Sequence, residues 1–126
     1  FKTAEMDGAG ISFAFRNLTY KNPLSEKHVS EIVRILKPGG RFVIAESSQP
    51  ASAFIRACYH FYMRNYVYRM GAVLSGNKPA YKYLAESACN YFSPREMKKF
   101  LTENGFKEIH YKPLFFGAAG IYIAVK

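Results

Sequence analysis

The chain has 126 residues and 49% of them are hydrophobic, so it can bury the core of one ordinary domain and is not a disordered composition. Its formal net charge of +9 favours an anionic partner, whether nucleic acid, anionic membrane surface or acidic substrate. The basic residues form no block, so a solvated basic surface is the plainer interpretation of the charge. No apolar run approaches the roughly 18 residues of a membrane-spanning helix and no signal peptide is visible, while Phe1 in place of a Met suggests a cut.

The cysteines and histidines indicate no metal site. Cys58 and Cys89 belong to no C-x-x-C pair, and the three histidines lie far apart in the sequence. We therefore expect two small buried thiols in a reduced, cytoplasmic protein, and no metal ion.

The first half of the chain reads as strand, helix, strand. Residues 11–15 are a short apolar run that predicts a buried strand, and residues 20–24 read as a loop. Ser25 is a candidate N-cap for a helix that Pro38-Gly39-Gly40 would stop. The apolar face of that helix is formed at helical spacing by Val29, Ile32, Val33 and Leu36. Residues 41–45 (RFVIA) then predict a strand buried on both faces of a parallel sheet.

The middle of the chain reads as two helices inserted after that strand. A polar loop over residues 46–50 precedes a long aromatic helix over residues 51–70. The segment Gly76 to Pro79 breaks the pattern, and a shorter helix is predicted over residues 80–90.

The last third reads as helix, strand, strand. Ser93, Pro94 and Glu96 form a capping-box signature, and Gly105 is a typical helix end. Strands are predicted over residues 106–112 and 121–125, with a turn over residues 117–120. The whole order, β-α-β, two inserted helices, then α-β-β, predicts an α/β fold.

No motif in the chain carries a chemistry by itself. Gly8 and Gly10 form only a G-x-G, without the rest of a nucleotide-binding fingerprint. Neither a Ser-His-Asp set nor a nucleophile elbow is present. The residues alone therefore indicate half of an α/β domain and no reaction.

Four stretches of the chain resemble a known family. Leu36 to Gly40 (LKPGG) before an apolar strand, with a terminal strand-turn-strand, resembles the C-terminal half of a Rossmann-like, class I S-adenosylmethionine (SAM)-dependent methyltransferase. ISFAFRNLT at residues 11–19, ESSQP at residues 46–50 and YKYLAES at residues 81–87 resemble the I-S-F-G-x-R-N-x-T, E-F-S-K-P and Y-x-Y-L-x-E-S of the UbiE-type ubiquinone/menaquinone methyltransferases. The chain departs from them at Ala14, Ser47 and Gln49, which stand where the family has Gly, Phe and Lys.

The resemblance implies roles for the residues that close the first strand. It puts Ser12 and Phe13 at cofactor-contacting positions, although a Ser merely packed in a strand is the alternative. It implicates Arg16 and Asn17 in activating the substrate, where a guanidinium would stabilise a developing phenolate. Because a guanidinium keeps its proton at neutral pH, a water held by Arg16 is a better base than Arg16 itself. The plainer alternative is an ion pair between Arg16 and a surface carboxylate.

The resemblance also implies a substrate cover over residues 51–90. Glu46 would line the pocket or orient Arg16, unless it is a solvated loop acid. An aromatic stripe is more often core than pocket, but four tyrosines are candidates to line a pocket for a prenylated ring: Tyr62, Tyr66, Tyr81 and Tyr83. Arg56, His60 and Arg64, spaced by four, form either a solvated face or a contact with anionic lipid.

The implied function is SAM-dependent C-methylation of a demethylated quinol, at most peripherally associated with the inner face of a membrane. The family's Gly-rich loop and the acidic residue after its second strand lie upstream, so we expect this chain alone to bind SAM weakly or not at all and to be inactive. The strand at 11–15 should expose an apolar edge, which favours a homo-oligomer. The alternatives are a methyltransferase of the same fold for another lipid or small molecule, and a non-catalytic basic assembly module. Nucleic acid is not an expected partner, because no RNA-recognition motif is present.

Overall fold

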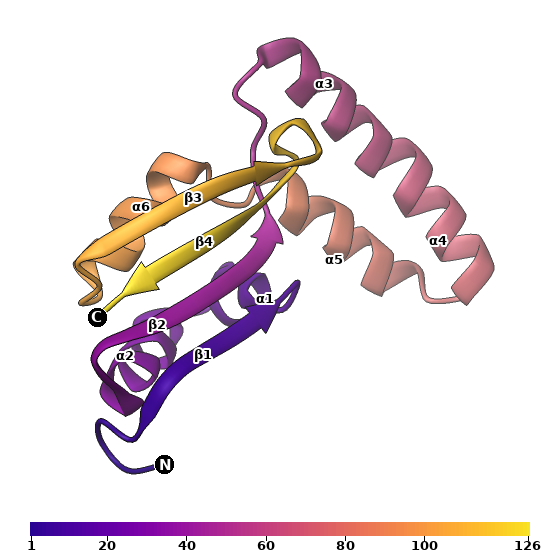
Figure 1. Ribbon diagram of the computed structural model, residues 1–126. Coiled ribbons are helices and arrows are strands. Elements are labelled where there is room, and N and C mark those ends of the chain that lie inside the picture. The colour runs from indigo at the N-terminus through magenta and orange to yellow at the C-terminus, as the bar shows by residue number, and fades with distance from the viewer.

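A computed structural model describes residues 1–126 and contains one four-stranded sheet with the strand order β1-β2-β4-β3 (Figure 1). Its strands are β1 (Met6–Ser12), β2 (Leu36–Ser47), β3 (Glu108–Leu114) and β4 (Ala119–Val125). Strands β1 and β2 are parallel, and β4 is antiparallel to both β2 and β3. The predicted parallel pair followed by a reversed terminal hairpin is confirmed.

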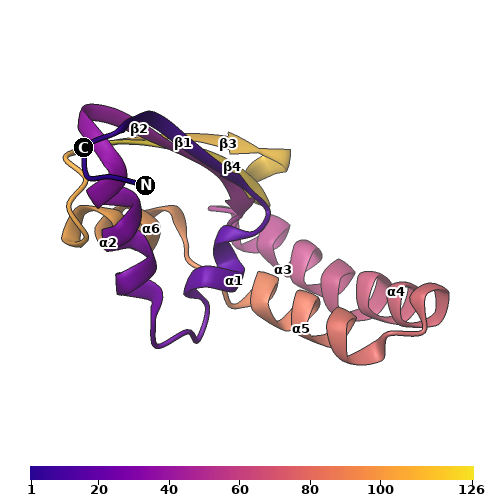
Figure 2. The same cartoon turned by 90° about the horizontal axis from the view of Figure 1, so that it is seen from below.

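Three helices cover one face of this sheet, as Figure 2 shows: α1 (Phe15–Thr19), α2 (Ser25–Ile35) and α6 (Pro94–Glu103). The core lies between them and the sheet. Phe42 of β2 stacks on Phe106 and meets the edge of Phe15, at ring-centroid distances of 5.9 and 5.6 Å. The predicted apolar face of α2 contributes Val29 to this core, and α6 contributes Met97 and Leu101. Burying these side chains is the main source of stability for a domain of this size.

The opposite face of the sheet is uncovered. Val43 and Ile123 are register partners there, and they keep 38% and 36% of their surface exposed. Strand β1 pairs on one side only, so it presents an unpaired edge. Strand β3 likewise pairs only with β4, so both edges of the sheet and this face could accept another polypeptide.

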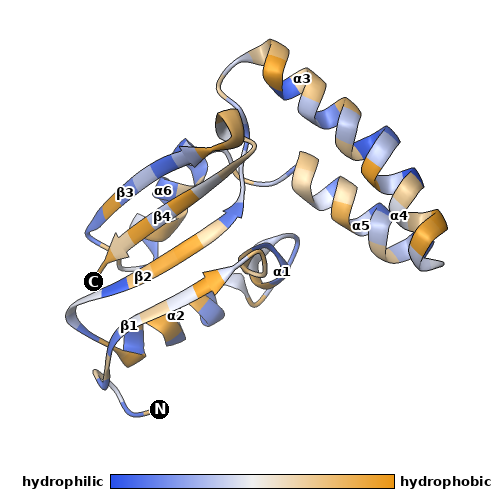
Figure 3. Cartoon of the chain, turned by 45° about the vertical axis from the view of Figure 1, so that its right-hand side comes forward, coloured by the Kyte–Doolittle hydropathy of each residue, from blue (hydrophilic) through white to orange (hydrophobic).

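The segment after β2 forms a helical arm, which we define as residues 53–89, projecting from the sheet (Figures 1 and 2). Its first leg is continuous: α3 (Ala53–Phe61), the π-helical turn η1 (Tyr62–Val67) and α4 (Tyr68–Ser75). The second leg, α5 (Lys78–Cys89), folds back on the first. A small cluster of Met63, Ala88 and Cys89 joins the legs. Figure 3 shows hydrophobic residues along both α3 and α4, although the arm stands away from the sheet.

The first strand differs from its prediction. It runs from Met6 to Ser12, and residues 13–15 leave the sheet. Phe13 has a φ of 49°, which turns the chain, and Phe15 begins helix α1. The Thr19 hydroxyl donates to the Phe15 carbonyl within that helix. A left-handed backbone conformation is uncommon for Phe, and no pattern in the sequence predicts it at this position.

Several helix ends also differ from their predictions. Ser25 is the first residue of α2 and not its cap, since Leu24 holds that position and Asn22 accepts a hydrogen bond from the Leu24 amide. The first leg of the arm ends at Ser75, five residues later than predicted, and α5 begins two residues earlier, with Asn77 as its cap.

The capping box is confirmed, because the Ser93 and Glu96 side chains each bond the other's backbone amide. The expectation of two buried thiols is wrong in part. Cys89 is buried within the arm, but Cys58 is exposed on α3.

Candidate functional site

The carboxyl ends of β1 and β2 bring together several of the predicted site residues. Ser12 ends β1 and Phe13 follows it, Arg16 lies in the first turn of the short helix α1, and Glu46 lies near the end of β2. Because the two strands are parallel and adjacent, their carboxyl ends meet at one edge of the sheet. In open α/β sheets that edge is where ligands bind.

Arg16 and Glu46 form a buried ion pair at this edge. One Glu46 oxygen, Oε1, accepts from Arg16 Nη1 at 3.3 Å, and the other accepts from the Arg16 amide at 3.0 Å. Arg16 Nη1 also donates to the Ser47 hydroxyl at 2.8 Å. The Arg16 residue is 5% exposed and Glu46 is fully buried. Glu46 thus orients Arg16, and it is neither a solvated loop acid nor an open pocket wall.

One polar atom of this cluster has no partner. Arg16 Nε is buried and makes no hydrogen bond within the chain. A buried donor without an acceptor costs free energy, and in native proteins such a group often marks a functional position. The guanidinium is therefore only partly used by Glu46 and Ser47.

Ser12, Phe13 and Asn17 lie on the open side of the same edge. Ser12 is exposed, and the Phe13 ring is 55% exposed while its amide donates to the Ala45 carbonyl at 2.8 Å. Asn17 is exposed and its side chain bonds neither Arg16 nor Glu46. The Arg-Asn pair of the sequence therefore separates into a buried cation and an outward amide.

Two further residues belong to this cluster, although no motif of the sequence marks them as site residues. Ser47 departs from the family pattern, yet its hydroxyl accepts a hydrogen bond from Arg16. Tyr59 of α3 lies near this cluster: burial raises the pKa of its hydroxyl, with Cys89 adding to the shift and the Ser47 hydroxyl opposing it. The helical pattern at residues 51–70 marks Tyr59 as a helix residue, but nothing local shows what it faces.

The four tyrosines predicted to line a pocket are spread over the arm. Tyr62 and Tyr66 stack on each other at 5.4 Å in the π-helical turn, and both are more than half exposed. The Tyr81 ring covers Gly71, where any Cβ would overlap it. Tyr83 meets the edge of Tyr20 at 6.3 Å. Within this chain they do not converge on one cavity.

The largest cavity lies elsewhere, between the start of the arm and the tip of the β3–β4 hairpin. It has a volume of about 540 Å³, and no predicted catalytic or cofactor-binding residue lines it. Its walls include Gln49, Arg56, Arg95, Tyr111 and Phe116.

The predicted basic stripe turns partly toward the protein. Arg56 donates to the Pro50 carbonyl, and His60 Nε2 lies 2.8 Å from Gln49 Oε1. Burial, followed by the charges of Arg64 and Arg56, lowers the pKa of His60. His60 is therefore predominantly uncharged near neutral pH. No helix of the chain combines the length and the apolar character needed to cross a membrane.

The chain shares its fold with solved S-adenosylmethionine-dependent methyltransferases. The CurJ carbon methyltransferase superposes with a TM-score of 0.61 at 16% identity, over 99% of this chain and 30% of that one. A SAM-dependent methyltransferase from Thermotoga maritima gives a TM-score of 0.60 at 17% identity, over 100% of this chain and 58% of that one. At these identities the likeness establishes the fold, and it confirms the predicted Rossmann-like class.

Residues 1–126 match the ubiE/COQ5 methyltransferase family along their whole length, and the chain belongs to that family. It is 36% identical over 126 residues to the ubiquinone/menaquinone biosynthesis C-methyltransferase UbiE of Rickettsia prowazekii, covering 100% of this chain and 49% of that protein. It is 35% identical over 127 residues to the demethylmenaquinone methyltransferase of Deinococcus radiodurans, covering 100% and 50%. The chain thus spans about half the length of these relatives.

Proposed function

We propose that this chain is the C-terminal part of a SAM-dependent C-methyltransferase that methylates a demethylated, prenylated quinol in ubiquinone or menaquinone biosynthesis. The observation that carries the proposal is that all 126 residues of the chain match the family, together with relatives named for this reaction. The relatives are about twice as long. We infer that an N-terminal, SAM-binding half completes the site and covers the open face of the sheet.

The chain's own residues fit a cofactor at the carboxyl edge. SAM, when bound, supplies an electrophilic methyl group. Ser12 offers an exposed hydroxyl and Phe13 an exposed ring at the end of β1, so both are free to contact it. Since only this half of the edge lies in the chain, we expect the 126 residues alone to bind SAM weakly or not at all.

In this proposal Arg16 stabilises the oxyanion of the substrate. Methylation at a ring carbon needs electron density there, which loss of a neighbouring hydroxyl proton supplies. A preorganised guanidinium near that oxygen stabilises the developing charge, an effect typically worth about 3–4 kcal/mol. Glu46 and Ser47 hold one nitrogen of Arg16 and leave Nε unused. Asn17, which is exposed beside it, would bond the same region of the ring or its water.

The arm would form the substrate cover over residues 51–90. Tyr62 and Tyr66 are exposed, so they would line the pocket for the ring or its tail only once the rest of the protein closes over them. Tyr81 packs between the two legs against Gly71, and Tyr83 packs against Tyr20 outside the arm, so both would take part in the cover from its base. Peripheral contact with a membrane would bring the cover close to a lipid-soluble substrate.

Assay of the complete protein tests this function. We expect it to transfer the methyl group of SAM to a demethylmenaquinol or demethylated ubiquinol analogue, and we expect the 126-residue chain to be inactive. Isotope-labelled SAM and mass spectrometry would locate the label on a ring carbon. Label on oxygen or nitrogen, or transfer only to unrelated lipids, would contradict the substrate assignment and favour another methyltransferase of the same fold.

The open edge of β1 should make the isolated chain self-associate. Unpaired strand edges recruit further strands. We expect light scattering of the 126-residue chain to show dimers or larger species, and Gly10→Lys to shift it toward monomer by placing a charge on the edge. A side chain fits there, since a Cβ at position 10 would lie 3.8 Å from its nearest neighbour, the Val43 carbonyl oxygen. A monodisperse wild-type monomer would contradict this expectation.

A further inference from the structure

The charged residues of the helical arm are almost all basic. Residues 47–85 contain no Asp or Glu, and they include five basic residues: Arg56, Arg64, Arg69, Lys78 and Lys82. More than half of the net charge of +9 therefore lies in this segment. None of the five forms an ion pair, and the one acidic residue of the arm, Glu86, pairs with Lys21 outside it. Such an unneutralised basic segment attracts an anionic surface.

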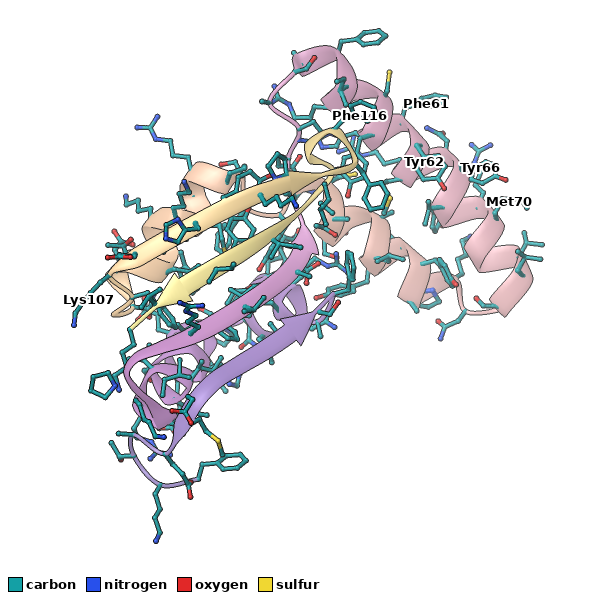
Figure 4. The ribbon with its side chains drawn as sticks, in the orientation of Figure 1. Phe61, Tyr62, Tyr66, Met70, Lys107 and Phe116 are labelled. Carbon is teal, nitrogen blue, oxygen red and sulfur yellow. The ribbon has the colours of Figure 1, made fainter.

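The same arm exposes large apolar side chains. Phe54, Phe61, Val73 and Leu74 each keep more than 70% of their surface exposed, and Met70 keeps 44%. Phe54 and Phe61 are seven residues apart, so they lie on one side of α3. Figure 4 shows Phe61 and Met70 on the side of the first leg that faces away from α5. We call these five residues the arm stripe.

The tip of the β3–β4 hairpin adds two more exposed rings. Phe115 and Phe116 are 77% and 85% exposed, and both adopt a left-handed backbone with φ of 49° and 57°. For a bulky residue this conformation is strained and points to a functional constraint. The tip adjoins the start of the arm, because a Cβ at Gly117 would lie 3.1 Å from Pro50 Cα. Two exposed phenylalanines therefore stand beside the arm.

We propose that the arm stripe and the two tip phenylalanines bind the surface of a bilayer that contains anionic lipid. Aromatic and aliphatic side chains on a predominantly basic element are the combination by which interfacial helices insert below lipid headgroups. A second protein copy would have to neutralise five basic charges with a surface of the same sign. The proposal extends the proposed function by locating its membrane contact, but its test does not require methyl transfer.

Vesicle co-sedimentation of the complete protein tests the proposal. We expect binding to phosphatidylcholine vesicles containing phosphatidylglycerol, weak binding to phosphatidylcholine alone, and loss of binding as salt screens the charges. Phe61→Gln/Met70→Gln/Leu74→Gln should lower the affinity at least about tenfold. Phe115→Asn/Phe116→Asn should also weaken binding, and Asn tolerates the left-handed backbone. Arg69→Gln/Lys78→Gln should weaken binding only to the anionic vesicles.

Matched controls use residues away from the arm. Leu24→Gln removes a half-exposed leucine between α1 and α2, and Lys107→Gln removes a cation at the far end of the sheet (Figure 4). Neither should change binding. Equal loss in these controls, no binding by the wild type, or a wild-type dimer that the triple variant dissociates would overturn the proposal.

A parallel assay with a tail-free, water-soluble quinol separates the two proposals. Methyl transfer without vesicle binding would contradict only the proposed membrane contact. Vesicle binding without methyl transfer would contradict only the proposed function.

Discussion

Glu46→Gln is expected to destabilise the folded protein by about 3–5 kcal/mol, because it leaves the buried Arg16 cation without its counter-charge. The Glu46 side chain is fully buried and accepts three hydrogen bonds, from the Arg16 amide, Arg16 Nη1 and the Ser47 amide. Gln keeps the shape, but it removes the charge and turns one acceptor into a donor. Urea unfolding of the complete protein, compared with wild type, measures the loss.

A surface pair provides the control for this prediction. Lys21 and Glu86 lie 2.9 Å apart with both side chains largely exposed. Glu86→Gln should change the unfolding free energy little, since exposed ion pairs contribute little. Ser47→Ala should lower the unfolding free energy by an amount between those of Glu86→Gln and Glu46→Gln, because it removes one acceptor of Arg16 and leaves the ion pair. Equal effects of Glu46→Gln and Glu86→Gln would show that the first pair is solvated.

Local features of the fold were predictable from the sequence. The capping box at Ser93 and Glu96 uses atoms three residues apart, and the apolar face of α2 follows helical spacing, so both are visible in a short window. The order of strands and helices followed from the same kind of pattern. The family assignment followed from motifs that the comparison confirms.

Features that depend on distant partners were not predictable. Arg16 and Glu46 are thirty positions apart, and no local pattern says that their side chains meet and are buried. The turn at Phe13 places an aromatic residue in a left-handed conformation, against its usual preference. Cys58 and Cys89 both lie in helices, but only the packing of α5 on the first leg decides that Cys89 is buried.

The position of Arg16 leaves two interpretations, structural and catalytic, and a paired replacement separates them. Arg16→Met/Glu46→Met exchanges the ion pair for apolar side chains of similar length. Such exchanges of buried ion pairs are often neutral or stabilising, so we expect this double variant to be more stable than Glu46→Gln. SAM binding should persist, because neither residue is assigned to the cofactor.

Methyl transfer by the same double variant should fall by about a hundredfold or more, the effect typical of losing one preorganised donor to a developing oxyanion. The loss should appear in kcat measured at saturating SAM and quinol, since the guanidinium is proposed to act on charge that develops during the reaction. Arg16→Lys should also be impaired, because an ammonium cannot bond Glu46 and Ser47 while presenting a second N–H to the substrate. If the double variant folds, binds SAM and methylates at the wild-type rate, the ion pair is structural and the substrate oxyanion is stabilised by other groups.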